Sequence, residues 1–361
     1  MSTVRYLSAA TRITNMNTTS TQTHIHKLPS EIKTEARKVI ERRLAETDPA
    51  LGCAPDKRPV EQLLQYGIVI VNKPKGPTSH QVSAYVQRIL GLEKSGHSGT
   101  LDPAVTGVLP VALEKATRIV QALLPAGKEY VAVMHIHKPV PREKLDAVIK
   151  RFTGTIRQKP PLRSAVKREI RPRTIYYLDV LEVEDQDVLI RMGCEAGTYV
   201  RKWIHDVGLA LEVGAHMEEL IRTKAGPFRT EDTVTLHDLQ DAWHYWKTEQ
   251  KDELLRKAVL PYERAAAHLP AVWVQDSCVD SLCHGALLHA PGVARMHDDI
   301  TPGDTVAVLT LKGELICLGI ARMTSQDMMK AERGVAVKVD VVFMQPGTYP
   351  KQATEKKQAV L

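Results

Sequence analysis

A single carboxylate lies in a glycine-rich segment, GHSGTLDPAVTGVL (residues 96–109). Asp102 precedes Pro103, and Asp-Pro is a common turn former, so one interpretation is an aspartate that caps its own turn. The other interpretation starts from the glycines of the segment, which relieve steric limits and let a ligand approach the backbone closely. A carboxylate in such a loop can attack an electrophilic carbon. The residues alone leave both interpretations open.

Arg201, in EAGTYVRKW, is the second candidate for chemistry. It falls in the first turns of a helix predicted over residues 197–211, off the apolar face that carries Val200 and Ile204. An arginine at such a position usually faces solvent. If it pointed inward it would need a carboxylate partner, because an unpaired buried charge is too costly. Asp102 is a candidate partner, although sequence spacing cannot establish contact.

Basic residues are densest at residues 157–173, which carry seven Lys/Arg and one Glu. This segment is either a solvated loop or, because its prolines hold the chain extended, a track for a phosphate backbone. His135 and His137 alternate on a predicted strand and share a face, as a metal-binding pair would. No third ligand with suitable spacing lies nearby in the sequence, so we expect no metal site.

Short β-branched runs and amphipathic helices must position these residues. The run GIVIV at 67–71 predicts a buried strand, and the Thr78-Ser79 pair predicts the start of a helix that ends at Gly91. The mixture of strands and helices has no strict βαβ repeat, which favours an α+β domain. Further strands are predicted at 129–136 and in two runs within 174–193, and further helices at 31–46, 114–124, 142–152, 197–211 and within 238–268.

The pattern changes after Leu269, where short β-rich runs alternate with turn signals around one helix at 280–288. Such regular alternation is typical of a small β-barrel or sandwich. We therefore predict a domain boundary near residue 268, which fits two domains in a chain of 361 residues.

Composition limits the partners and the cellular compartment that we expect for the protein. The net charge of +7 permits a polyanionic partner without requiring one. No apolar run reaches the roughly 18 residues that would cross a bilayer, so we expect no membrane association. The five cysteines are odd in number and never spaced CxxC, which favours a reducing, cytoplasmic setting over a disulfide scaffold.

Six motifs occur in an order that composition could not show. They are VNKPKGPTSHQV, GHSGTLDPAVTGVLPVALEKATR, AGKEYVAVMHIH, KPPLRSAVKREIRPRTIYY, EAGTYVRKWIHDVGLAL and GAHMEELIRTKAGPF. Together they resemble the pseudouridine synthases of the family that contains the bacterial tRNA TΨC-loop enzyme and dyskerin. The LPSEIK…DKRP extension and the short tail after Pro350 resemble the archaeal members. The segments CHGALLHAPGV, GDTVAVLTLKGE and PGTYP resemble a PUA domain, an RNA-binding barrel.

The resemblance implies a fold and a domain order. The fold would be a mixed, largely antiparallel sheet with flanking helices, followed by the PUA barrel. The implied parts are a flexible tail (1–30), an N-terminal extension (31–66), a catalytic domain (67–268), the PUA domain (269–344) and a C-terminal tail (345–361).

The resemblance also assigns roles to single residues. Asp102 matches the catalytic aspartate, which attacks the target uridine so that the base leaves N1, rotates and rejoins through C5. Arg201 matches the arginine that pairs with it, and Tyr130 the tyrosine that stacks on the flipped uracil. The isomerisation gains and loses no atoms, so no cofactor is implied. The remaining matches are Leu220 and, more weakly, Tyr199 in the pocket, His97 near the RNA path, and Lys73 with a structural part.

The sequence departs from the family pattern at Lys202, where a small hydroxyl residue is common, and at Ile221, where a second arginine is usual. The implied partners are tRNA and rRNA substrates, a box H/ACA guide RNA, and three proteins of the H/ACA complex. These proteins are a small zinc-ribbon protein, a Gly-rich β-barrel protein and a kink-turn-binding ribosomal protein.

Two other functions compete with this one. A non-catalytic RNA scaffold could share the fold, although a scaffold need not keep both GTLDP and GTYVR. A carboxylate glycosidase normally uses two carboxylates, and no second Asp or Glu lies within the Asp102 loop.

Overall fold

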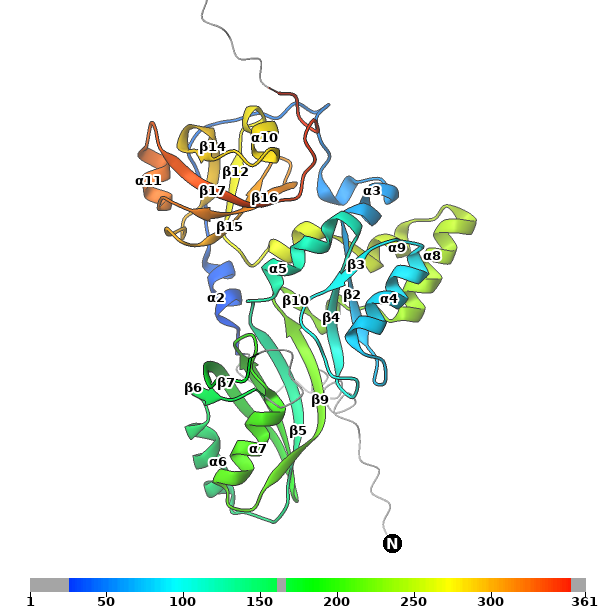
Figure 1. The fold of residues 1–361 in the computed structure, drawn as a ribbon, viewed down its shortest axis with the longest axis vertical. Coiled ribbons are helices and arrows are strands. Elements are labelled where there is room, and N and C mark those ends of the chain that lie inside the picture. The colour runs from blue at the N-terminus through cyan, green and yellow to red at the C-terminus, as the bar shows by residue number, and fades with distance from the viewer. Residues whose placement is uncertain (1–25, 161–166, 352–361) are drawn as a thin grey trace, which may run out of the picture. The chain divides into compact units, whose positions relative to one another are not determined.

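The computed structural model describes residues 26–160 and 167–351 (Figure 1). Residues 1–25 of the predicted flexible tail, and residues 352–361 of the predicted C-terminal tail, lie outside this range. The chain forms two compact units. Unit 1 comprises the residues up to Ile32, Val69–Val111 and Val120–Ala258, and unit 2 comprises Lys33–Ile68, Ala112–Ile119 and Val259–Leu361. Residues 33–66 of the expected extension thus group with the C-terminal part.

Unit 1 is built on a mixed sheet with the strand order β2-β4-β9-β5-β8-β7-β6, in which β3 pairs with β4 and β10 with β9. Most pairs are antiparallel, and β4 runs parallel to β9. The long strands β5 and β9 run together through the unit (Figure 1). The strands are β2 (Gly67–Lys73), β3 (Ser95–His97), β4 (Thr106–Leu113), β5 (Lys128–Ile136), β6 (Gly154–Gln158), β7 (Arg171–Glu184), β8 (Asp187–Cys194), β9 (Ala215–Ala225) and β10 (Phe228–Arg229).

Helices cover this sheet, and their sequences explain where they begin and end. Helix α4 (Ser79–Leu90) begins at a capping box, in which the Thr78 side chain accepts from Gln81 N, and ends at Gly91 in the left-handed conformation. Helix α7 (Val200–Ala210) packs its apolar stripe, including Trp203, against the core under β5, β8 and β9. The others are α5 (Val120–Leu123), α6 (Arg142–Arg151), α8 (Leu236–Glu249) and α9 (Glu253–Ala258). Helix α2 (Pro29–Ala36) begins in unit 1 and ends in unit 2.

Unit 2 contains a second, curled sheet with the order β1-β14-β12-β15-β16-β17-β13 around its own apolar core. Helices α3 (Val60–Gln65), α10 (Asp276–Cys283) and α11 (Ser325–Lys330) belong to this unit, and β11 (Val259–Pro261) follows α9. The strands are β1 (Val39–Glu41), β12 (Ala271–Val274), β13 (Leu288–His289), β14 (Val293–His297), β15 (Thr305–Leu309), β16 (Leu315–Ala321) and β17 (Val335–Val342).

The structure corrects several predicted elements. The helix predicted at 31–46 stops at Ala36, and residues 39–41 form β1, because β14 offers them hydrogen bonds that no local pattern reveals. The helix predicted at 280–288 covers only the second half of α10, which begins at Asp276; Gly285, with φ of 83°, follows its end. The segments 114–124 and 238–268 are only partly α-helical. They contain 3₁₀ turns at Glu114–Ile119 and Tyr262–Ala266 and the strand β11.

Within residues 26–160 and 167–351, no helix combines the length and the apolar character that crossing a membrane requires. The five cysteines are free thiols.

Candidate active site

Asp102 lies in the loop between β3 and β4, and Arg201 is the second residue of α7. Arg201 Nη2 donates to Asp102 Oδ2 at 2.9 Å, and the two side chains are 60% and 61% exposed. Asp102 accepts the turn hydrogen bond from Val105 N with its backbone carbonyl, at 3.0 Å, which leaves the carboxylate to the arginine. Solvent screens a pair this exposed, so it contributes at most about 1 kcal/mol to stability. Its geometry matters for chemistry more than for folding.

The buried Lys73 fixes the Asp102 loop by hydrogen bonds to its backbone. Lys73, at the end of β2, is 0% exposed, and its ammonium donates to the carbonyls of Pro74 at 2.9 Å, Pro103 at 3.2 Å and Val105 at 2.8 Å. Burial lowers the pKa of Lys73, and the nearby Asp102 carboxylate opposes that shift. The three carbonyls saturate the donors of the ammonium, so Lys73 shapes the loop and has no donor left for a substrate.

The first residue of α4 and the turn before this helix also form hydrogen bonds to the Asp102 loop. The Ser79 hydroxyl donates to the carbonyl of Leu101 at 3.1 Å and accepts from Leu101 N at 2.8 Å. Gly76 N donates to the Pro103 carbonyl at 2.8 Å. The residues on either side of Asp102 are therefore fixed while its carboxylate stays accessible.

Tyr130 on β5 is half-buried and pairs across the sheet with Arg222 on β9. Burial raises the pKa of Tyr130, so its phenol stays protonated; Arg222 lowers this pKa and the Asp102 charge raises it. Leu220, two residues before Arg222 on β9, is also half-buried and packs with Tyr130 on the core that contains Trp203.

Arg222 is a site residue that sequence reasoning missed. It is 1% exposed; its Nε donates to Val108 O at 2.8 Å and its Nη2 donates to Gly99 O at 2.9 Å. A Cβ at Gly107, where φ is 103°, would lie 2.2 Å from the Arg222 carbonyl, and one at Gly99 would lie 3.1 Å from Nη1. These glycines thus admit Arg222, whereas one of the two interpretations of the sequence had them admit a ligand. The sequence feature that could have indicated Arg222 is a charged residue within the half-apolar run ELIRTKA, next to Ile221, where the sequence departs from the family pattern.

His97 and Tyr199 lie at the edge of this group. His97, on β3, is half-buried, and its Nδ1 has no hydrogen-bond partner among the described residues. Burial, His80 and Arg222 together lower the pKa of His97, in that order, which favours a neutral ring. Tyr199 is the N-cap residue of α7; its backbone N–H donates to Gln158 Oε1 at 3.0 Å and its carbonyl accepts from Gln158 Nε2 at 3.1 Å. Tyr199 thereby ties the start of α7 to β6.

The basic segment reaches the same end of α7. Residues 161–166 lie outside the described residues, but Arg173 packs on Gly197, where a Cβ would come within 3.1 Å of its Nη2. Glu195 accepts from Arg173 Nη1 at 3.4 Å, while Arg157 and Lys159 are exposed. Exposed cations therefore lie at the end of β6, where Gln158 hydrogen-bonds to Tyr199 at the start of α7.

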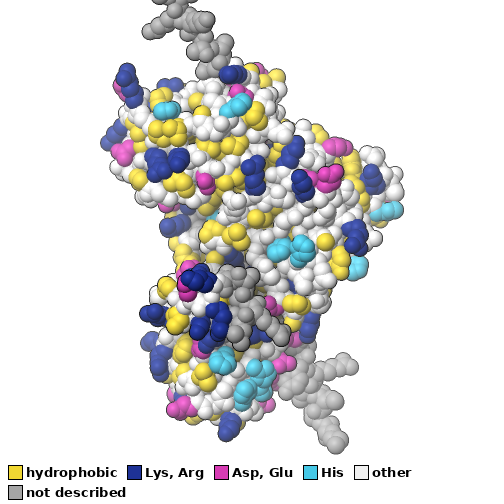
Figure 2. Space-filling model, viewed as in Figure 1, with side chains coloured by type: hydrophobic (Ala, Val, Ile, Leu, Met, Phe, Trp, Pro, Cys, Tyr) yellow, Lys and Arg dark blue, Asp and Glu magenta, His cyan; other side chains and the backbone are white. Residues whose placement is uncertain are grey.

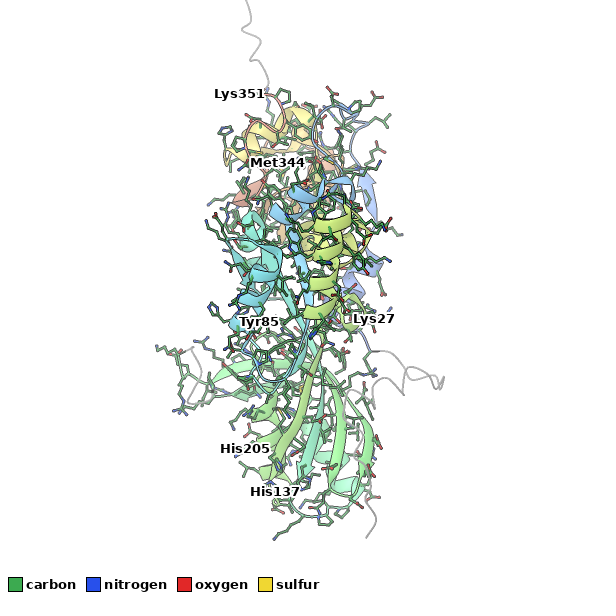
Figure 3. All side chains as sticks on the ribbon, turned by 90° about the vertical axis from the view of Figure 1, so that its right-hand side faces the viewer. Lys27, Tyr85, His137, His205, Met344 and Lys351 are labelled. Atoms are coloured by element: carbon green, nitrogen blue, oxygen red, sulfur yellow. The ribbon has the colours of Figure 1, made fainter. Side chains whose placement is uncertain are left out.

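His135 on β5 and His137 just after it have a third histidine as a neighbour, which the sequence did not reveal. His137 Nε2 lies 3.0 Å from His216 Nδ1, and His135 Nδ1 lies 2.7 Å from Asp187 Oδ1. Histidines gather on the lower part of the face in Figure 2, and Figure 3 places His137 at the far end of the strands. No group of three ligands among the described residues has the arrangement of a metal site.

Family models match most of the chain. The model described as TruB family pseudouridylate synthase (N terminal domain) matches residues 87–142 and 135–200, and the tRNA pseudouridylate synthase B C-terminal domain matches 201–267. A PUA domain matches 270–343, and a DKCLD (NUC011) domain matches 26–83.

Curated relatives are similar over nearly their whole length. The chain is 56% identical over 315 residues to the probable tRNA pseudouridine synthase B of Methanopyrus kandleri, covering 87% of this chain and 93% of the relative. It is 57% identical over 331 residues to the protein of the same name from Thermococcus kodakarensis, covering 91% and 97%.

Solved structures are similar to the same extent. A structure of an H/ACA RNP bound to a substrate RNA containing 2′-deoxyuridine contains a chain with 53% identity and a TM-score of 0.84. A crystal structure of a Cbf5-Nop10-Gar1 complex contains one with 55% identity and a TM-score of 0.85. Each match covers 90% of this chain and 99% of the other.

Proposed function

This chain belongs to the TruB family of pseudouridylate synthases, isomerases that act on RNA, and from that premise we propose that Asp102 is its nucleophile. The observation that carries the assignment is the accessible Asp102 carboxylate, held 2.9 Å from Arg201 on a loop that Lys73 and Ser79 fix. A fixed loop with an exposed carboxylate presents a nucleophile in a defined direction.

In the proposed reaction the carboxylate attacks the target uridine, and the bond between N1 of the base and C1′ of the ribose breaks. The base turns and rejoins the ribose through C5, so that product and substrate have the same atoms. Arg201 orients the carboxylate and balances its charge. The first attack can fall on C1′ or on the ring, or the reaction can pass through a glycal, and each route begins from the same aspartate.

Tyr130 supplies the surface on which the extruded uracil stacks. Its ring is half-buried and its phenol is protonated, so the face it offers is uncharged. Leu220 forms an apolar wall beside it, with Tyr199 at the start of α7. His97, the neutral ring on β3, lies toward the RNA path, and Lys73 acts through the loop rather than on the substrate.

We propose tRNA, at the TΨC-loop uridine (position 55), as one substrate, and rRNA selected by a box H/ACA guide RNA as the other. The names of the relatives and the H/ACA and Cbf5-Nop10-Gar1 structures support these two substrates. The proposed protein partners are the small zinc-ribbon, Gly-rich β-barrel and kink-turn-binding proteins of such a complex. Base pairing to a guide would choose the uridine, so the protein need read only shape and backbone.

We further propose that the catalytic domain spans 67–268 and the PUA domain 269–344; matches that end at 267 and begin at 270 support this boundary. We place the protein in the cytoplasm, which its free cysteines favour.

Replacing the nucleophile tests the proposal. We expect Asp102→Asn to lower the single-turnover rate of pseudouridine formation more than about a thousandfold while RNA affinity changes less than about twofold. The measurement is pseudouridine mapping on tRNA transcripts, and on rRNA fragments with guide RNA and partner proteins. Asp146→Asn is the matched control, because Asp146 is an exposed aspartate 2.9 Å from an arginine of the same unit.

Full activity in Asp102→Asn would overturn the assignment of the nucleophile. If the wild-type protein binds these RNAs with its partners and isomerises no uridine, the scaffold function replaces the proposal. Hydrolysis of soluble glycosides by the wild type, lost in Asp102→Asn, would favour the glycosidase instead.

A further inference from the structure

The pairing of β5 with β9 contains a β-bulge directly beside the site. Glu129 lies opposite Lys224, but the next residue, Tyr130, lies opposite Arg222. Thr223 is therefore the extra residue on β9. Without the bulge Tyr130 would face Thr223, and Arg222 would move one place along, opposite Val131. The bulge decides which side chain of β9 accompanies the tyrosine.

The Glu129 side chain binds both residues that form the bulge. Glu129 is 6% exposed; its Oε1 accepts from the Thr223 hydroxyl at 2.8 Å, and its Oε2 lies 3.4 Å from Lys224 Nζ. Consecutive residues of a regular strand point to opposite faces, so a single carboxylate reaches both only because of the bulge. Oε2 also accepts from the Tyr177 hydroxyl on β7 at 2.5 Å.

This carboxylate lies on the face of the sheet away from the reacting groups. Tyr130, Ala132 and Leu220 pack on the core that contains Trp203, whereas Val131 and Ile221 pack in a separate cluster on the other face. Glu129 precedes Tyr130 and therefore points with Val131. It does not touch the substrate and can act only by fixing the backbone.

The charge of Glu129 is balanced by a network within unit 1. Lys224 Nζ also lies 3.1 Å from Glu31 Oε2 on α2, and Glu31 Oε1 accepts from Arg229 Nη2 at 2.6 Å. Leu28 N donates to Glu31 Oε2 at 2.7 Å. Two carboxylates and two cations thus neutralise each other, which makes burial of Glu129 tolerable. Burial and Glu129, in that order, raise the pKa of Tyr177, which therefore remains a hydrogen-bond donor.

We propose that Glu129 is a positioning residue of the pseudouridine synthase reaction: it fixes the β-bulge that sets Tyr130 opposite Arg222, beside the Asp102 loop. The inference rests on the proposed roles of Asp102 and Tyr130. Loosening the bulge moves the ring that holds the extruded base, and a displacement of about 1 Å can cost about a hundredfold in rate. Binding of the RNA backbone involves other residues and stays intact.

The test measures the single-turnover rate and the RNA affinity separately, on tRNA transcripts with the full chain. We expect Glu129→Ala to lower the rate about 10- to 100-fold with affinity unchanged within about twofold. Glu129→Gln keeps one acceptor oxygen for the Thr223 hydroxyl, and its amide N–H can donate to the Tyr177 hydroxyl oxygen, so it should recover part of that loss. Thr223→Val removes one hydroxyl of the bulge without changing shape, and we expect a rate loss of about 3- to 10-fold. Glu218→Gln, an exposed residue on β9, is the control and should keep the wild-type rate.

A wild-type rate in Glu129→Ala, or an affinity that falls as far as the rate, would overturn the inference. If Glu129→Ala does not fold, Thr223→Val and Tyr177→Phe decide the matter, because both leave the carboxylate in place; unchanged rates in the two variants reject the positioning role. Failure of the wild type and of Glu218→Gln to form pseudouridine would instead reject the proposed function. The two failures are therefore distinguishable.

Discussion

Residue-scale features of the site differ in how far the sequence reveals them. The Asp102 and Arg201 candidates follow from their motifs, and in the structure Arg201 Nη2 lies 2.9 Å from Asp102 Oδ2. Arg222 has no local signature, because its partners are the carbonyls of Val108 and Gly99, more than a hundred residues away in sequence. A buried arginine bound by backbone carbonyls is recognisable only when the strands are paired.

The approach of Arg222 to Gly107 predicts a stability difference between two glycines. Gly107→Ala places a methyl 2.2 Å from the Arg222 carbonyl, whereas Gly76→Ala meets nothing within 4 Å, although both residues have a positive φ. We expect Gly76→Ala to lower the free energy of unfolding by about 1 kcal/mol, the cost of φ alone. Gly107→Ala should cost about 3 kcal/mol or more.

Urea denaturation of the two variants checks this prediction. If both variants lose the same free energy of unfolding, backbone strain, and not the close approach of β9, makes glycine necessary at position 107.

At the scale of elements, strong local patterns predict well and long-range pairings do not. Helix α4, with its capping box and Gly91, and helix α7, with its apolar stripe, appear where the sequence predicts them. The α+β class and the pseudouridine synthase and PUA folds are confirmed by the matched families and structures. Strand β1 was missed because its partner β14 lies more than 250 residues away, and the β5–β9 bulge is equally invisible in a single strand.

The junction of α5 and β5 predicts a pH dependence of stability. Lys128 is 6% exposed, and its ammonium donates to the carbonyls of Leu123, Leu124 and Ala126. Burial, and next the charge of Arg222, lowers its pKa from 10.5 to about 8. Between these two values the unfolded chain binds more protons than the folded chain, so the free energy of unfolding rises with pH from about 8 to 10.5.

Urea denaturation between pH 8 and pH 10 measures this contribution as the difference between the wild type and Lys128→Met. The variant is less stable at every pH, because three carbonyls lose a hydrogen-bond donor. Its free energy of unfolding should, however, increase less between pH 8 and pH 10 than that of the wild type. Parallel curves for the two proteins would contradict the lowered pKa.

At the scale of the whole molecule, the net charge of +7 is unevenly distributed along the chain. Residues 269–344 carry six Lys/Arg and nine Asp/Glu, a net charge of −3, so the rest of the chain carries +10. RNA contact by the PUA part must therefore depend on a local groove, hydrogen bonds and shape. The density of cations at 157–173 makes that segment the better candidate for phosphate contact.

Salt dependence of RNA affinity tests this distribution. We expect Arg157→Gln and Lys159→Gln each to reduce the slope of log affinity against log salt concentration by about 0.7 to 0.9, the value for one phosphate contact. Lys330→Gln, an exposed lysine on α11 in unit 2, should leave the slope unchanged. A larger loss of slope in Lys330→Gln than in the other two would place the phosphate contacts on the PUA part.

The exposure of the Asp102–Arg201 pair has a consequence for fidelity. Both side chains are about 60% exposed, so the described protein leaves the proposed nucleophile, Asp102, open to water. If water reaches C1′ of the ribose after the base has left, its oxygen bonds to that carbon and its proton goes to the base, which leaves RNA with a missing base instead of an isomer. The bound RNA must then exclude water from the site itself. An RNA that binds in the wrong position can lose its base, whereas a correctly bound RNA shields the detached base until it rejoins the ribose.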